Sequence, residues 1–187
     1  MPSDPSIDTP GRDVLLRVAL GVGVILATVG LLAPVVRSHR APAGPPPPDA
    51  LHVEVLALRW SWRFRYAGPD GVFGTADDVT TLNDLRVPAG RAVALQVRSA
   101  DVVHGFFLPR LHVRTDAFPG RTSSTWFRPA RPGREELMCS VLCGDAHDQM
   151  RAEVTVLSNE EYVHWMNGWT AASRPTPDAR WAWAWTP

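Results

Sequence analysis

The chain has 187 residues, 45% of them hydrophobic and 20% charged, a composition typical of one folded domain with short appendages. All 19 basic residues are arginines, and 19 acidic residues balance them, which excludes the basic surface expected of a nucleic-acid binder. Two cysteines are too few for a disulfide-stapled mini-domain, and 18 prolines favour loops and strands over long soluble helices.

The first predicted element is an apolar helix at residues 14–36, after an N-terminal tail of residues 1–13. Residues 18–36 carry no charge, and at 1.5 Å per residue they span about 28 Å, close to the hydrocarbon thickness of a bilayer. A core helix of a soluble protein is the first alternative, but the segment is apolar on every face and leaves no polar side for solvent, and a cleaved signal peptide usually has a shorter apolar core. We therefore predict a single-pass membrane anchor. The flanking charges do not fix its orientation.

A proline-rich linker and a β-domain are predicted next. Residues 37–50 include four consecutive prolines and predict a stiff spacer. In residues 53–66 apolar and polar side chains alternate, which predicts one half-buried strand. Further strands are predicted at residues 92–97, 102–108, 122–127, 136–138 and 153–157, separated by turns. This pattern predicts an all-β sandwich or barrel over residues 51–157.

Two other segments carry weaker signals. Residues 158–187 predict a short helix at 159–169 and a tail with Trp181, Trp183 and Trp185, which either lies at a membrane interface or another subunit, or has no fixed structure. Residues 70–78 are rich in Asp and Gly but lack the Asp spacing of an EF-hand loop, so a Gly-rich turn is favoured over a calcium site.

Four candidate metal-ligand residues lie within the twelve residues 139–150. Cys139, Cys143, His147 and Met150 follow one another with three, three and two residues between them. Thiolates and a thioether stabilise Cu(I), and imidazole suits both copper oxidation states. Zinc also takes Cys and His, but its sites rarely include Met. A blue copper site uses one Cys, and this segment has two.

This motif, with His104 located 35 residues before Cys139, resembles the dinuclear copper A site of cytochrome c oxidase subunit II. The flanking segments 101–104, 107–109, 115–121 and 131–133 follow the order of that family, over roughly residues 51–166. The resemblance implies a cupredoxin-like Greek-key β-barrel after one N-terminal transmembrane helix. It also implies that the cofactor is two copper ions.

The resemblance assigns six ligands. Cys139 and Cys143 would bridge the two coppers, His104 and His147 would bind one copper each, and Met150 and the backbone carbonyl of Val141 would be weak ligands. A disulfide between the cysteines is the alternative expected in an exported domain. The nearby imidazoles and thioether favour the metal site over the disulfide.

Trp60 matches the tryptophan through which the family receives electrons, although a core position on a strand is the alternative. The carboxylates predicted to form an acidic docking surface for a basic cytochrome are Asp101, Glu135, Glu136, Asp145 and Asp148. Val141 occupies a position where many relatives have a glutamate that also binds magnesium or manganese, so that second metal is not expected here.

The resemblance implies a single-pass subunit of a bacterial cytoplasmic membrane, similar to the one-helix subunit II of B-type, ba3-like oxidases, with its metal domain on the periplasmic or extracellular side. Such a subunit accepts electrons from cytochrome c or a small copper protein and passes them to haem in the catalytic oxidase subunit I. It would not reduce oxygen by itself. The alternatives are a copper A module of a nitric oxide or nitrous oxide reductase, and a membrane-anchored Cu(I) delivery protein.

Overall fold

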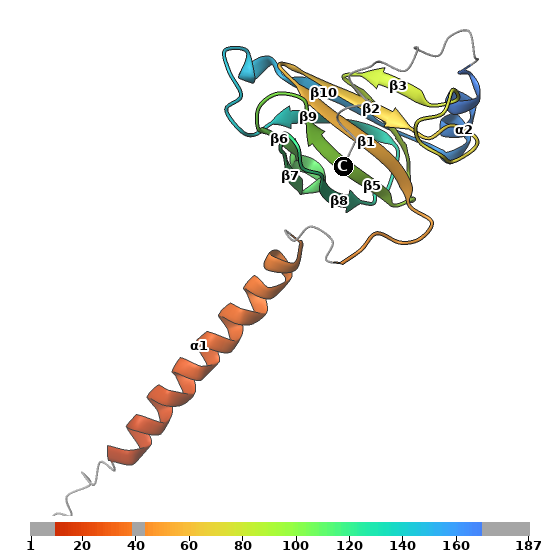
Figure 1. Cartoon of the computed structure of the whole chain (residues 1–187). Coiled ribbons are helices and arrows are strands. Elements are labelled where there is room, and N and C mark those ends of the chain that lie inside the picture. Colours follow the sequence, from red (N-terminus) through yellow and green to blue (C-terminus); the bar gives the residue numbers. More distant parts are fainter. Residues whose placement is uncertain (1–9, 39–43, 170–187) are drawn as a thin grey trace, which may run out of the picture. The chain divides into compact units, whose positions relative to one another are not determined.

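A computed structural model describes residues 10–38 and 44–169 of the chain (Figure 1). The chain divides into two units, residues 1–40 and 41–187. The first unit contains the helix α1 (Pro10–Ser38). Its segment Asp13–Ala33 has 21 residues with a mean hydropathy of 2.3, and every side chain in that segment is exposed. At 1.5 Å per residue the segment is about 32 Å long, which is enough to cross a bilayer.

The second unit is an all-β domain built from two five-stranded sheets (Figure 1). The first sheet has the order β3 (Val79–Leu82), β2 (Ser61–Tyr66), β1 (Leu51–Leu58), β5 (Val93–Ser99) and β8 (Ser123–Phe127). The second has the order β4 (Asp84–Pro88), β10 (Arg151–Leu157), β9 (Gly133–Cys139), β6 (His104–Leu108) and β7 (Val113–Ala117). The sequence prediction of an all-β domain is therefore confirmed.

One hydrophobic core takes side chains from both sheets. Phe64 and Val55 come from the first sheet, Leu137 and Val154 from the second, and all four are fully buried. In β2 and β10 buried residues alternate with more exposed ones, as expected for strands with one face on the core. Neighbouring strands pair out of chain order, since β1 lies between β2 and β5 and pairs with β5 in parallel.

The prediction of a single strand over residues 53–66 is wrong. The chain reverses after β1, and the antiparallel register that pairs Leu58 with Ser61 makes β1 and β2 a tight hairpin. The alternation of side chains continues through the turn, which is why the sequence did not reveal it. Trp60 consequently lies in the turn, with 37% of its surface exposed, whereas Trp62 on β2 is fully buried.

The strands β3, β4 and β7 were not predicted. β3 and β4 are short and are separated only by Asn83, whose φ of 53° places it in the left-handed region. The segment between β2 and β3 is a turn region, as expected. There the carboxylates of Asp77 and Asp78 accept hydrogen bonds from the backbone N–H groups of Asp70 and Gly74 at 3.1 and 2.8 Å.

The end of the proline-rich segment is bonded to the β-domain. The Trp126 indole Nε1 donates to the Gly44 carbonyl at 3.0 Å, and Arg91 Nε donates to the Asp49 carbonyl at 2.9 Å. Ala50 is buried in a small cluster with Ala92 and Ala94. Residues 44–50, the end of the predicted stiff spacer, are thus attached to the domain.

The helix α2 (Asn159–Asn167) follows β10 directly. Its N-terminus has a capping box, in which the Ser158 hydroxyl accepts from the Glu161 N–H and the Glu161 carboxylate accepts from the Ser158 N–H. Trp165 packs edge-on against Tyr66 with ring centroids 5.3 Å apart. The predicted tail with Trp181, Trp183 and Trp185 lies outside the described residues.

Replacing Tyr66 by Phe should lower the free energy of unfolding by about 1–3 kcal/mol, because the Tyr66 hydroxyl accepts a 2.8 Å hydrogen bond from the backbone N–H of Arg86 inside the protein. The matched control is Tyr162→Phe, since the buried Tyr162 hydroxyl has no hydrogen-bond partner among the residues described. Denaturant unfolding of the full chain in detergent measures both. Equal losses in the two variants would contradict this reading.

Candidate metal centre

The predicted ligands come together at one end of the second sheet. His104 is the first residue of β6 and Cys139 the last residue of β9. The chain then forms a ligand loop, residues 140–150, which includes the short 3-10 helix η2 (His147–Gln149) and ends at Met150, just before β10. Antiparallel pairing of β9 with β10 therefore brings the two ends of this loop together.

Two features fix the ligand loop. The Cys139 N–H donates to the Met150 carbonyl at 3.1 Å, and the Ser140 N–H donates to the Gly105 carbonyl at 2.9 Å. A Cβ on Gly105 would lie only 2.2 Å from Ser140 Oγ and 3.1 Å from the carbonyl carbon of Ser140. A larger residue at this position would force the Ser140 side chain to move and would crowd its backbone, so glycine favours the close approach of β6 to the loop.

The donor atoms of the six predicted residues form a connected cluster. Cys139 Sγ lies 3.7 Å from Cys143 Sγ and 3.1 Å from the Val141 carbonyl oxygen. Cys143 Sγ lies 3.6 Å from His147 Nδ1 and 3.8 Å from Met150 Sδ. His104 Nδ1 lies 3.1 Å from Met150 Sδ. Candidate ligand atoms of His104, Cys139 and Cys143 all lie within 4.8 Å of one another.

The cluster is buried on one side and accessible on the other. His104 and Met150 are fully buried, whereas His147 is half-buried and Leu142 is 82% exposed.

Both cysteines are free thiols. Burial raises the pKa of the Cys143 thiol to about 11, and the neighbouring Cys139 adds to the effect. A metal that binds here must displace thiol protons, because the thiolate is the ligand.

Asp101 orients His104, a role that was not evident from the sequence. Asp101 Oδ1 lies 2.8 Å from His104 Nε2, and the same carboxylate accepts from the backbone N–H groups of Arg59 and Val102 at 2.8 and 2.6 Å. Burial alone would raise the pKa of Asp101, but the hydrogen bonds from His104, Arg59 and Val102 outweigh it and lower that pKa. This contact leaves Nδ1 of His104 as the nitrogen that faces the cluster.

Burial lowers the pKa of His104, although the adjacent Asp101 carboxylate acts in the opposite direction. The neutral imidazole is therefore favoured, and the neutral form is the one that binds metals. Two thiols, two imidazoles, a thioether and a carbonyl form a sulfur-rich donor set, which fits copper better than the hard cations that prefer oxygen.

Trp60 lies against the ligand loop from the β1–β2 turn. A Cβ on Gly144 would lie 3.3 Å from Trp60 Nε1, and Gly144 has a φ of 129°. The backbone angle thus favours glycine where the loop passes the indole, and the space there is tight. The partial exposure of Trp60 makes it a surface residue next to the metal ligands.

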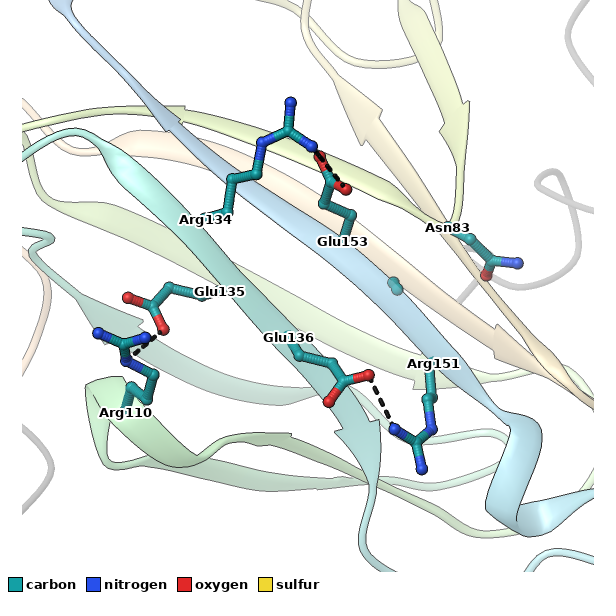
Figure 2. A pocket seen from close by; sticks show the side chains of 8 residues that line it. Asn83, Arg110, Arg134, Glu135, Glu136, Arg151 and Glu153 are labelled. Carbon is teal, nitrogen blue, oxygen red and sulfur yellow. Dashed lines mark hydrogen bonds and ion pairs between the residues drawn. The ribbon is translucent and has the colours of Figure 1, made fainter.

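A separate hollow of about 520 Å³ lies over β9 and β10, where charged side chains form pairs (Figure 2). The pairs are Arg110 with Glu135, Arg134 with Glu153, and Arg151 with Glu136. Each exposed pair adds little stability, but it offsets the negative charge of its glutamate. These ion pairs therefore weaken the glutamate part of the predicted acidic surface, whereas its aspartates, Asp101, Asp145 and Asp148, are exposed.

Comparison with known proteins shows which family the chain resembles. The sequence model described as "Cytochrome C oxidase subunit II, periplasmic domain" matches residues 69–157. The alternative cytochrome c oxidase subunit 2 of Bradyrhizobium diazoefficiens is 36% identical over 174 residues, which cover 81% of this chain and 61% of that protein. The heme-copper oxidase subunit 2 of Aeropyrum pernix is 35% identical over 162 residues, covering 84% of this chain and 64% of that protein. The chain thus spans less than two thirds of either relative.

Two solved structures are similar to the β-domain. The periplasmic domain of cytochrome oxidase subunit II of Bradyrhizobium japonicum has a TM-score of 0.58 and 29% identity, covering 65% of this chain and 94% of that one. A mixed disulfide between a thioredoxin-like protein and a cytochrome c oxidase subunit II has a TM-score of 0.55 and 30% identity, covering 65% of this chain and 92% of that one. The fold and the donor set define a cupredoxin-like domain with a sulfur-rich candidate metal site. The chain belongs to the cytochrome c oxidase subunit II family.

Replacing Asp101 by Asn should weaken copper binding about 10- to 100-fold, because the carboxylate that orients His104 is lost. Competition of the full chain with a copper chelator measures the affinity. Asp145→Asn is the control, since it removes the same charge from an exposed position of the ligand loop. Equal affinities of the two variants would show that the Asp101 contact does not hold His104.

Proposed function

We propose that this chain is the electron-accepting subunit of a terminal haem-copper oxidase. Its six donor residues would hold a dinuclear copper A centre, with Cys139 and Cys143 as bridging thiolates. The observation that carries the proposal is the convergence of a buried His104 and Met150 with two free thiols and a half-buried His147. When bound, two copper ions at this site would supply a one-electron store.

Hydrogen bonds within the chain hold the six donor residues in place. The hydrogen bonds of Cys139 to Met150 and of Ser140 to Gly105 hold the ligand loop on the sheet. Asp101 fixes the tautomer of His104. Burial of most donors excludes water, so little solvent would rearrange when charge moves through the site.

The partially exposed Trp60 supports a docking site for an electron donor next to the ligand loop. The indole lies against Gly144, directly after Cys143, and the exposed Asp145 and Asp148 are close by in the loop. An apolar centre with an acidic rim suits a basic partner such as cytochrome c, and a small copper protein is the other candidate donor. The electron would pass on to haem in a catalytic subunit I, and oxygen reduction would occur there.

The anchor and the β-domain suit a subunit bound to a bacterial cytoplasmic membrane. Asp13–Ala33 would cross the bilayer once, with the metal domain on the periplasmic or extracellular side. The family description of the matched segment as a periplasmic domain supports that side. One membrane helix within the described residues is also consistent with the B-type, ba3-like form.

Free thiols are a precondition for copper loading. The related subunit II in the mixed disulfide reacts with a thioredoxin-like protein. By analogy, a thioredoxin-like reductant would keep Cys139 and Cys143 in the dithiol state in an oxidising compartment.

Copper-loaded full chain should contain two copper ions and take up one electron per pair of ions in a reductive titration. Metal analysis and optical titration of the detergent-solubilised protein measure both numbers. A single bound Cu(I) that accepts no electron would instead indicate a copper-delivery protein, and the proposed electron transfer would then be abandoned.

Replacing Trp60 by Ala should slow reduction by a basic cytochrome c about tenfold, in line with a loss of more than about 1 kcal/mol for a buried aromatic contact in an interface. Stopped-flow mixing measures the rate. Leu82→Ala is the control, because Leu82 is an exposed apolar residue of β3. Equal rates in the two variants, with unchanged copper spectra, would exclude Trp60 as the docking residue.

A further inference from the structure

The His104 imidazole makes a polar contact through each of its two ring nitrogens. Nε2 lies 2.8 Å from Asp101 Oδ1, and Nδ1 lies 3.1 Å from Met150 Sδ. A hydrogen bond through a ring nitrogen is directed along the plane of the ring in its ideal geometry, so contacts of this kind restrain rotation within that plane more than a tilt of the plane itself. Another group must oppose the tilt.

Trp62 is in the position to do so. Its ring centroid lies 6.2 Å from that of His104, with an angle of 65° between the planes, an edge contact. Both residues are fully buried, so water cannot replace this contact. The Asp101 side chain, in contrast, is 31% exposed, and its contact with His104 competes with solvent.

The Trp62 ring is supported from another side by Phe106. The two centroids lie 5.5 Å apart with an interplanar angle of 87°. Phe106 is the register partner of Cys139 in the pairing of β6 with β9. One indole therefore contacts the ring of one ligand residue and the strand neighbour of another.

The backbone of Trp62 is fixed relative to the ligand loop through Asn83. The Trp62 N–H donates to Asn83 Oδ1 at 2.7 Å, and the Asn83 N–H donates to the Trp62 carbonyl at 2.8 Å. The Glu153 N–H donates to the Asn83 carbonyl at 3.0 Å. Asn83 thus ties β2 to β10, the strand that starts directly after Met150.

The indole N–H does not explain why a tryptophan stands here. In the part of the chain that is described, Trp62 Nε1 is buried and has no hydrogen-bond partner, an arrangement that costs free energy. The two edge contacts of the ring account for the residue better, since aromatic pairs in this geometry attract one another.

We propose that Trp62 is a positioning residue for the metal centre: its buried ring prevents the His104 imidazole from tilting and so keeps Nδ1 directed at the metal. This role rests on the proposed copper function. It makes Trp62 a determinant of copper retention and of the reduction potential. Trp60, two residues earlier, would instead contact the electron-donor protein.

The test compares Trp62→Phe with Phe64→Leu in the copper-loaded full chain. Phe64 is fully buried on the same face of β2 and has no ring contact with His104 among the described residues, so both variants reduce core packing. The measured quantities are the rate of copper release to a Cu(I) chelator under reducing conditions, the midpoint potential and the thermal stability.

Trp62→Phe should release copper at least about tenfold faster than the parent chain, the lower end of the effect of losing an outer-shell contact, and should shift the midpoint potential. Phe64→Leu should lose stability but keep the parent release rate and potential. Phe106→Leu removes the support behind Trp62 and should change both readouts in the same direction, which keeps the test valid if Trp62→Phe does not fold.

The outcomes separate two kinds of failure. If the parent chain binds copper normally and Trp62→Phe behaves like Phe64→Leu in release rate and potential, the positioning role is overturned while the proposed function stands. If the parent chain binds no copper, both are overturned.

Discussion

The hydrogen bond from the Cys139 N–H to the Met150 carbonyl closes the ligand loop, and the geometry of the metal centre depends on that closure. Closing a loop of about ten residues costs conformational entropy, and here the pairing of β9 with β10 provides the closure. Once the loop ends meet, Cys139, Cys143, His147 and Met150 have little room to separate. The close approach of Gly105 to Ser140 then adds His104 from β6.

This construction produces a gradient of burial across the site. The donors nearest the core, His104 and Met150, are inaccessible to solvent, while His147 is half-buried and Trp60 lies partly exposed at the β1–β2 turn. The proposed electron relay would need both properties, because exclusion of water limits the rearrangement that accompanies charge transfer and one accessible side allows a partner to approach. The same fold therefore protects the centre and exposes one side of it.

The residues of the candidate site differ in how directly the sequence could indicate them. The ligands after Cys139 are close in the chain, so their spacing alone indicated a metal site, whereas His104 was assigned only through resemblance to a family. Asp101 was read as a surface charge, since nothing in the sequence shows that its carboxylate reaches His104. The partners of Glu135 and Glu136 are arginines distant in the chain, so their ion pairs could not be predicted.

The fold, like the site, was predictable where the signal lies within a short stretch of sequence. The anchor and most strands were evident from hydrophobic patterning, but the turn at Arg59 and Trp60 was hidden because side chains continue to alternate through it. The strands β3 and β4 are short and separated only by Asn83, whose left-handed backbone is a property of the folded chain. The contact of Trp62 with His104 depends on that same turn, which sends β2 back along β1.

The most direct test of the account is electron paramagnetic resonance of the copper-loaded full chain in its oxidised form. The six converging donors predict one unpaired electron with hyperfine coupling to two equivalent copper nuclei. Coupling to a single copper nucleus, or no signal from protein that retains its copper, would contradict the dinuclear centre.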